Sequence, residues 1–141
     1  MIKLLFAAVG SLGFGILFNA NKNKLVFIAI GGFVNYLAYL ISFYFTSSLF
    51  VSSLICAFVT LIYSELMAYI SKAPATIFIL TGLIPSVPGA SIFYMMQNLV
   101  IGDKTLALSS CVEACEIILG IVSGVALASV LIGLIKSFRK K

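Results

Sequence analysis

Long apolar runs, separated by charges, prolines and short polar clusters, divide the chain into five segments. They cover residues 2–20, 25–45, 49–70, 74–101 and 106–135, and the connections between them are very short. A helix needs about 20 mostly apolar residues to cross a hydrocarbon layer about 30 Å thick. The pattern therefore predicts an all-α integral membrane protein with about five transmembrane helices, folded as a single membrane domain over residues 1–141.

The composition supports a membrane environment and excludes several function classes. Of the 141 residues, 62% are hydrophobic and 9% are charged, whereas soluble domains carry about a quarter charged residues. The chain has no glycine-rich loop of the GxxxxGK[ST] type, which ATP-driven transporters use to hold phosphates. We therefore expect no ATP-driven transport by this chain alone, and no cofactor.

The basic residues lie at segment ends, which predicts an orientation in the membrane. Cytoplasmic loops are enriched in Lys and Arg. With five crossings, seven of the nine basic residues share one face, namely Lys22, Lys24, Lys72, Lys136, Arg139, Lys140 and Lys141, and the other face has Lys3 and Lys104. This bias places the C-terminus in the cytoplasm and the N-terminus outside. A re-entrant fourth segment would give a weaker bias of five against four. The net charge of +5 is thus explained without nucleic-acid binding.

Three cysteines, Cys56, Cys111 and Cys115, fall inside predicted spans. An odd count at such positions argues against a disulfide framework, and small buried side chains are the simplest interpretation. Cys111 and Cys115 share a helix face, but the chain has no histidine and no CxxC motif. We therefore predict no metal site.

Two prolines interrupt the fourth segment. Pro85 and Pro88 lack the N–H groups that would continue a helix, so the carbonyls of Thr81 and Ile84 should lose their partners. Pro85 and Pro88 follow the start of the segment by roughly 16 to 21 Å of helix, near mid-membrane. Backbone of this kind is tolerated in a membrane only where protein buries it or where it borders a water-filled cavity.

The residues after the second proline predict a binding site for an anionic group. A new helix starting there would leave the N–H groups of Gly89, Ala90 and Ser91 free, at the positive end of the helix dipole. Secondary transporters repeatedly aim such half-helices at substrate carboxylates. The candidate substrate-binding residues are Pro85, Ser86, Pro88, Gly89, Ala90 and Ser91. The alternative is a simple proline kink packed against neighbouring helices.

Three acids lie in or near predicted spans and are candidates for proton coupling: Glu113, Glu65 and Glu116. A charge at the bilayer centre costs at least about 2.5 to 3.5 kcal/mol on insertion scales, so acids there usually have a function. Glu65 could instead pair with Lys72 or reach the membrane interface, because it lies about one turn from the end of its segment.

Several segments also have a polar or small-residue face. Gly120, Gly124 and Ala128 recur every four residues, a spacing that lets two helix backbones approach closely. Other stripes hold Gly32, Asn35, Tyr39 and Ser42 in the second segment, Ser53, Cys56, Thr60 and Ser64 in the third, and Ser109, Glu113, Glu116, Gly120 and Ser123 in the fifth. Hydrogen bonding between helices is the simpler interpretation of the uncharged stripes.

The residues around the break resemble a known family. Ala73-Pro74-Ala75-Thr76-Ile77-Phe78, followed by Gly82-Leu83-Ile84-Pro85-Ser86-Val87-Pro88-Gly89 and Tyr94, is similar to the C-terminal half of threonine/serine exporters, and more closely to their split, YjjB-like small subunit. The resemblance implies export of threonine and serine, or of dicarboxylates such as succinate, driven by the membrane gradient. It also implies a second, YjjP-like larger membrane subunit.

The leading hypothesis is therefore a subunit of a proton-coupled secondary exporter in the bacterial cytoplasmic membrane. Its substrate would be a small carboxylate or amino acid, and a homo-oligomer is left open. The alternative is a non-transporting scaffold or assembly subunit of a larger transporter. An enzyme is not expected, because the chain has no histidine to act as a base and no serine beside a plausible lysine within a span.

Overall fold

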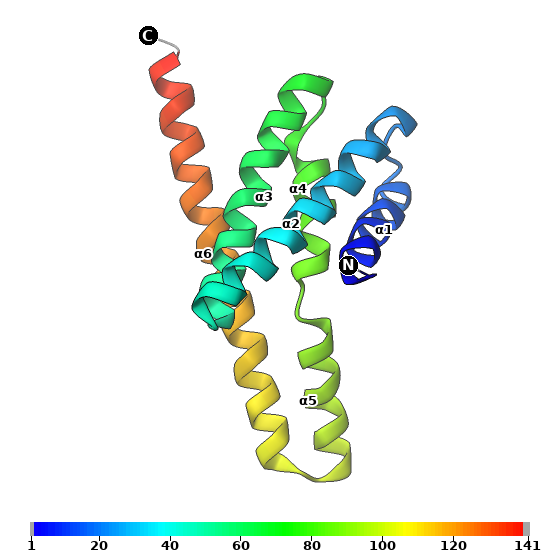
Figure 1. Cartoon of the computed structure of the whole chain (residues 1–141), viewed down its shortest axis with the longest axis vertical. Helices are drawn as coiled ribbons and strands as arrows, with labels where there is room; N and C mark the ends of the chain where they lie inside the picture. Colours follow the sequence, from blue (N-terminus) through cyan, green and yellow to red (C-terminus); the bar gives the residue numbers. More distant parts are fainter. Residues whose placement is uncertain (1, 140–141) are drawn as a thin grey trace.

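The computed structural model describes residues 2–139, and throughout this range the regular structure is helical. In chain order the elements are α1 (Ile2–Leu17), η1 (Lys22–Lys24), α2 (Leu25–Thr46), α3 (Leu49–Ser71), α4 (Ala75–Leu83), η2 (Ile84–Ser86), α5 (Gly89–Ile101) and α6 (Lys104–Arg139). Figure 1 shows the helices running alternately up and down, with α4 and α5 following one another in the same direction.

Within residues 2–139, three helices are long and apolar enough to cross a membrane: Lys22–Thr46, Leu49–Ser71 and Lys104–Phe138. The α4–η2 and α5 pair counts as a fourth if it forms one bent span. The all-α membrane architecture is thus supported, whereas a count of five spans is not. The first predicted segment, 2–20, contains the 16-residue helix α1, which is shorter than the about 20 residues that a span needs. Its crossing stays a prediction.

The connections that carry most of the basic residues lie at one end of the molecule. In Figure 1 the α1–α2 connection with Lys22 and Lys24, the α3–α4 turn with Lys72, and the C-terminal end of α6 all lie toward the top. The α5–α6 turn lies at the opposite end. From the charge pattern, these basic residues are expected to share one face of the membrane, and their position at one end of the molecule agrees with that expectation. That this face is the cytoplasmic one stays a prediction.

Helix α3 forms the centre of the fold, because α2 and α6 both pack on it. Cys56 and Ala57 on α3 and Ala128 on α6 are fully buried. On α6, a Cβ added to Gly120 would collide with the Phe50 carbonyl oxygen, and one added to Gly124 would collide with that of Leu54. The close approach predicted from the small-residue spacing is therefore confirmed.

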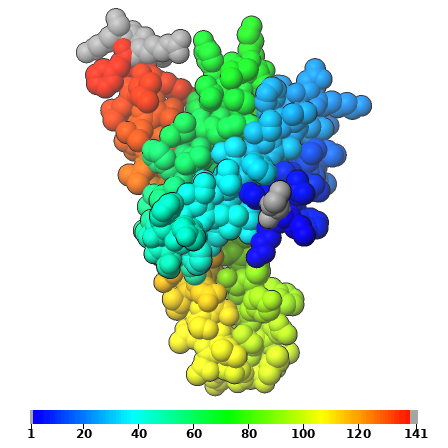
Figure 2. Space-filling model, in the orientation of Figure 1, coloured from blue at the N-terminus to red at the C-terminus, as the bar shows by residue number. Residues whose placement is uncertain are grey.

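A two-helix hairpin, formed by α5 and residues 104–119 of α6, projects beyond the other helices (Figures 1 and 2). Gly120 faces the start of α3, so residues 104–119 form roughly 24 Å of helix before that contact. Helix α5 contains no buried residue, and its Val100 side chain is 88% exposed. Within the chain, this hairpin has little apart from itself to pack on.

Candidate functional site

The fourth segment is broken at the two prolines, as predicted. Helix α4 ends at Leu83, a 3-10 turn covers Ile84–Ser86, and α5 begins at Gly89 with its axis bent by 47°. The Val87 N–H donates to the Ile84 carbonyl at 3.1 Å. The expectation that Ile84 would lose its partner is therefore wrong, because the chain tightens into a 3-10 turn that supplies a donor from three residues ahead.

The start of α5 offers fewer free donors than expected. The Gly89 N–H donates to the Val87 carbonyl at 2.8 Å, so the prediction that it is free is wrong. The first bond of the helix runs from the Ile92 N–H to the Pro88 carbonyl at 3.1 Å. Among residues 2–139 the N–H groups of Ala90 and Ser91 have no acceptor. These two groups form the available positive end of α5.

A pocket of about 220 Å³ opens beside this helix start. Five of the six predicted substrate-binding residues line it, namely Pro85, Ser86, Pro88, Ala90 and Ser91, together with Val87, Tyr36 and Tyr39 of α2, and Ile117 of α6. Gly89 does not line the pocket. Sites for drug-sized ligands usually measure about 300 to 1,000 Å³, so this one suits a small metabolite.

Behind the pocket, a chain of hydrogen bonds ties the break to α2 and α3. The Ser86 hydroxyl donates to Asn35 Oδ1, and Asn35 Nδ2 donates to Thr60 Oγ1 at 2.8 Å. The Thr60 hydroxyl in turn donates to the Cys56 carbonyl at 2.7 Å. Cys56 Sγ lies 3.4 Å from Ser86 Oγ. The stripe pattern includes Asn35, Cys56 and Thr60 but does not reveal that both stripes face the break.

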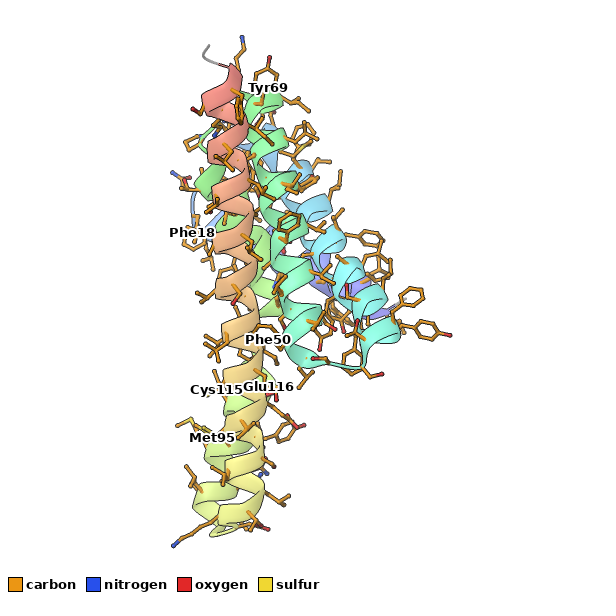
Figure 3. All side chains as sticks on the ribbon, turned by 90° about the vertical axis from the view of Figure 1, so that its left-hand side faces the viewer. Phe18, Phe50, Tyr69, Met95, Cys115 and Glu116 are labelled. Carbon is orange, nitrogen blue, oxygen red and sulfur yellow. The ribbon has the colours of Figure 1, made fainter. Side chains whose placement is uncertain are left out.

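The three acids lie away from the pocket. Glu113 and Glu116 are exposed on α6, and Figure 3 shows Glu116 in the hairpin, a short way below Phe50, which lies in the first turn of α3. Glu65 is half-buried and forms an ion pair with Lys136 Nζ at 2.8 Å. Lys72 is therefore not its partner, because α6 runs alongside α3 and brings Lys136 to Glu65.

The comparison with protein families decides the class of the protein. The model of the family described as "Threonine/Serine exporter, ThrE" matches residues 3–131. The chain belongs to the threonine/serine exporter family. The search of curated proteins and the search of solved structures gave no match. Membership in this exporter family supports a membrane transport role.

The range matched by the family model contains the whole candidate site. Residues 3–131 include the break, every residue that lines the pocket, and the three acids, but end before Lys136. The ion pair at Glu65 thus uses a residue outside the range that the exporter family model describes.

The cysteines take no part in a recognisable metal centre. Cys56 is buried, Cys111 is half-buried and Cys115 is exposed, and all three are free thiols. Within residues 2–139 no group of three potential metal-binding side chains is found. Cys56 is instead the cysteine that contacts the break, through Ser86.

Proposed function

We propose that this protein is a membrane subunit of a secondary exporter for small carboxylate-bearing metabolites, with threonine and serine as the first candidates and a dicarboxylate such as succinate as the next. It would act in the bacterial cytoplasmic membrane with a second, YjjP-like subunit. The observation that carries the proposal is the pocket at the helix break, which opens onto the start of α5.

The chemistry of this pocket suits a carboxylate. The N–H groups of Ala90 and Ser91 and the helix dipole favour a negative group at the start of α5. By contrast, the start of α6 is capped by its own Asp103, whose Oδ1 accepts the N–H groups of Thr105 and Leu106 at 3.2 and 3.1 Å. Helix α5 has no such side-chain cap, which leaves its N–H groups for a ligand.

Energy for export would come from the membrane gradient, with protons carried by Glu113 and Glu116. Neither carboxylate touches the pocket, but Ile117 lies one helical turn after Glu113 and lines it. A proton at Glu113 could therefore influence the pocket through a small movement of α6. Glu65, held by Lys136 near the end of α3, would exchange protons at the basic end of the molecule.

A partner subunit would also explain the exposed hairpin. Helix α5 buries none of its residues within the chain, and Glu113 and Glu116 have no cationic partner among residues 2–138. Carboxylates facing lipid would be costly, whereas a second protein could cover them. The same surface favours the alternative function, in which the chain is a scaffold that stabilises a larger transporter without contacting substrate.

Substitution inside the pocket separates the two functions. Ala90 lines the pocket, so Ala90→Leu should reduce export of labelled threonine and serine by roughly tenfold, which corresponds to about 1.4 kcal/mol. Ala126→Leu, at an exposed position of α6 away from the pocket, is the matched control. Efflux would be measured from cells that contain both subunits, after confirming that they assemble. Unchanged efflux in Ala90→Leu would favour the scaffold.

A further inference from the structure

Among the polar side chains near the break, Asn35 has an unusual position. It is fully buried in the middle of α2 and bonds to two other elements, the η2 turn through Ser86 and helix α3 through Thr60. The buried hydroxyls of Ser64 and Thr81 instead donate to carbonyls of their own helices, and that of Ser52 donates to the carbonyl of Ser48, directly before α3.

The directions of the two hydrogen bonds that Asn35 makes are fixed. The Thr60 hydroxyl has one hydrogen, which it donates to the Cys56 carbonyl at 2.7 Å, so it can only accept from Asn35. Ser86 donates its hydrogen to Asn35 Oδ1. The residue between them must accept on one side and donate on the other. An amide does both, whereas a carboxylate or an aliphatic side chain of similar size does not.

The break is also held by packing, because the η2 turn contacts α1, α2 and α3, and Pro88 is buried. The η2 turn contains no buried residue, and α5 packs mainly on α6. The preceding helix α4 approaches α3 closely at Gly82, where an added Cβ would lie 2.9 Å from Thr60 Cγ2. Thr60 therefore meets both α4 and the amide of Asn35. Besides this packing and its contact with Cys56 Sγ, Ser86 is tied to α2 and α3 by hydrogen bonds that run through one residue, Asn35.

We propose that Asn35 is a positioning residue of the exporter: through Ser86 and Thr60 it holds the broken helix so that the start of α5 lies correctly at the pocket. This inference rests on the proposed function, because the pocket is taken as the substrate site. Asn35 does not line the pocket itself. Its role is to set the geometry of residues that do.

Cys56 provides a native reporter for the position of the break. Its thiol is fully buried, and Ser86 Oγ lies 3.4 Å from Sγ. If the break moves away from α3, the thiol becomes more accessible to N-ethylmaleimide. The other two cysteines would be replaced, as Cys111→Ala and Cys115→Ala, so that labelling reports on Cys56 alone. The whole chain would be assayed with its partner subunit in membranes.

The test compares Asn35→Leu and Thr60→Val with two matched controls. Thr60→Ser keeps the hydroxyl, and Ser64→Ala removes a buried hydroxyl that bonds only within α3. Asn35→Leu should accelerate labelling of Cys56 by roughly tenfold and Thr60→Val by roughly threefold, as expected when the Asn35 amide loses both of its bonds to other elements or only one of them. The half-saturating substrate concentration for export should rise in the same order. Both controls should behave like the parent.

Three outcomes would overturn the inference. Unchanged labelling in Asn35→Leu and Thr60→Val would show that the amide does not hold the break. Equal acceleration in Ser64→Ala would show general loosening of the helices instead of a specific bond. Faster labelling with an unchanged half-saturating concentration would show that the position of the break does not serve the substrate. If the parent pair exports none of the proposed substrates, the proposed function fails, whereas the labelling still decides whether Asn35 holds the break.

Discussion

The helix break and the projecting hairpin differ in what surrounds their polar side chains. At the break, Ser86, Asn35 and Thr60 come from three different elements and bond to one another inside the fold. In the hairpin, Glu113 and Glu116 are exposed on α6, and α5 buries none of its residues. Both regions belong to the same chain and are joined at Pro88 and Gly89.

This difference indicates which parts of the exporter the chain can build by itself. Buried polar groups are stable in an apolar interior only when they are hydrogen-bonded, and the break meets this condition with its own residues. The hairpin would meet it only with lipid around its apolar side chains and protein near its carboxylates. The break thus forms a pocket lined by this chain's own residues, whereas the hairpin leaves its side chains exposed.

The largest loss of stability is expected where α6 packs closely on α3. Gly124→Leu should destabilise the protein by about 3 kcal/mol, because the new side chain would collide with the Leu54 carbonyl between α3 and α6. Gly133→Leu on the same helix is the control, since a Cβ there meets no atom within 4 Å. Thermal unfolding in detergent would measure both. Equal stability of the two variants would contradict the packing of α6 on α3.

A second substitution, in the hairpin, tests whether this region takes part in transport or only in assembly of the subunits. Glu113→Gln keeps the size of the side chain but cannot exchange a proton, so export should fall by about tenfold or more and lose its pH dependence. Ser109→Ala, four residues earlier on the same stripe, should leave export unchanged, because its hydroxyl bonds only to the Leu106 carbonyl. Full export by an assembled Glu113→Gln complex would remove Glu113 from the proton pathway.

The features predicted correctly from the sequence are those that local chemistry determines. The lengths of the apolar runs place α2 and α3 to within about one residue of their observed ends, and the missing N–H groups of Pro85 and Pro88 locate the break. The features that were wrong depend on distant partners or on details of turn geometry. Lys136 lies 71 residues from Glu65, and the Gly89 N–H is used by a tight turn that a simple helix start would not include.

The site shows the same division between local and distant determinants. Five of the six residues proposed from the broken helix line one pocket, because they are neighbours along the chain. The contributions of Tyr36, Tyr39 and Ile117 depend on how α2 and α6 are rotated toward the break. Helical spacing identifies the faces of a helix but does not say which face meets which neighbour.

A smaller effect on stability is expected from the ion pair that joins α3 to α6 near the C-terminal ends of both helices. The Glu65 and Lys136 side chains are 30% and 64% exposed, so their coupling in a double-mutant cycle should be about 0.2 to 1 kcal/mol. Glu65→Gln, Lys136→Met and the double variant would be compared by unfolding in detergent. A coupling above about 2 kcal/mol would mean that the pair is shielded from water, and this end would then resemble the break more than an exposed surface.

The smallest effect concerns the turn at the tip of the hairpin, where α6 begins. Hydrogen bonds from the Thr105 hydroxyl and the Leu106 N–H hold the pKa of Asp103 below its ordinary value, so the cap is intact at neutral pH. Its contribution should be lost as the pH falls below about 4 and the carboxylate becomes protonated. Amide hydrogen exchange in the first turn of α6 should then accelerate beyond its intrinsic pH dependence.

Asp103→Asn keeps a capping oxygen that does not titrate, so this variant should show no such step. The α5 start, which has no side-chain cap, should likewise show none, and a step there in the absence of substrate would contradict the contrast between the two helix starts.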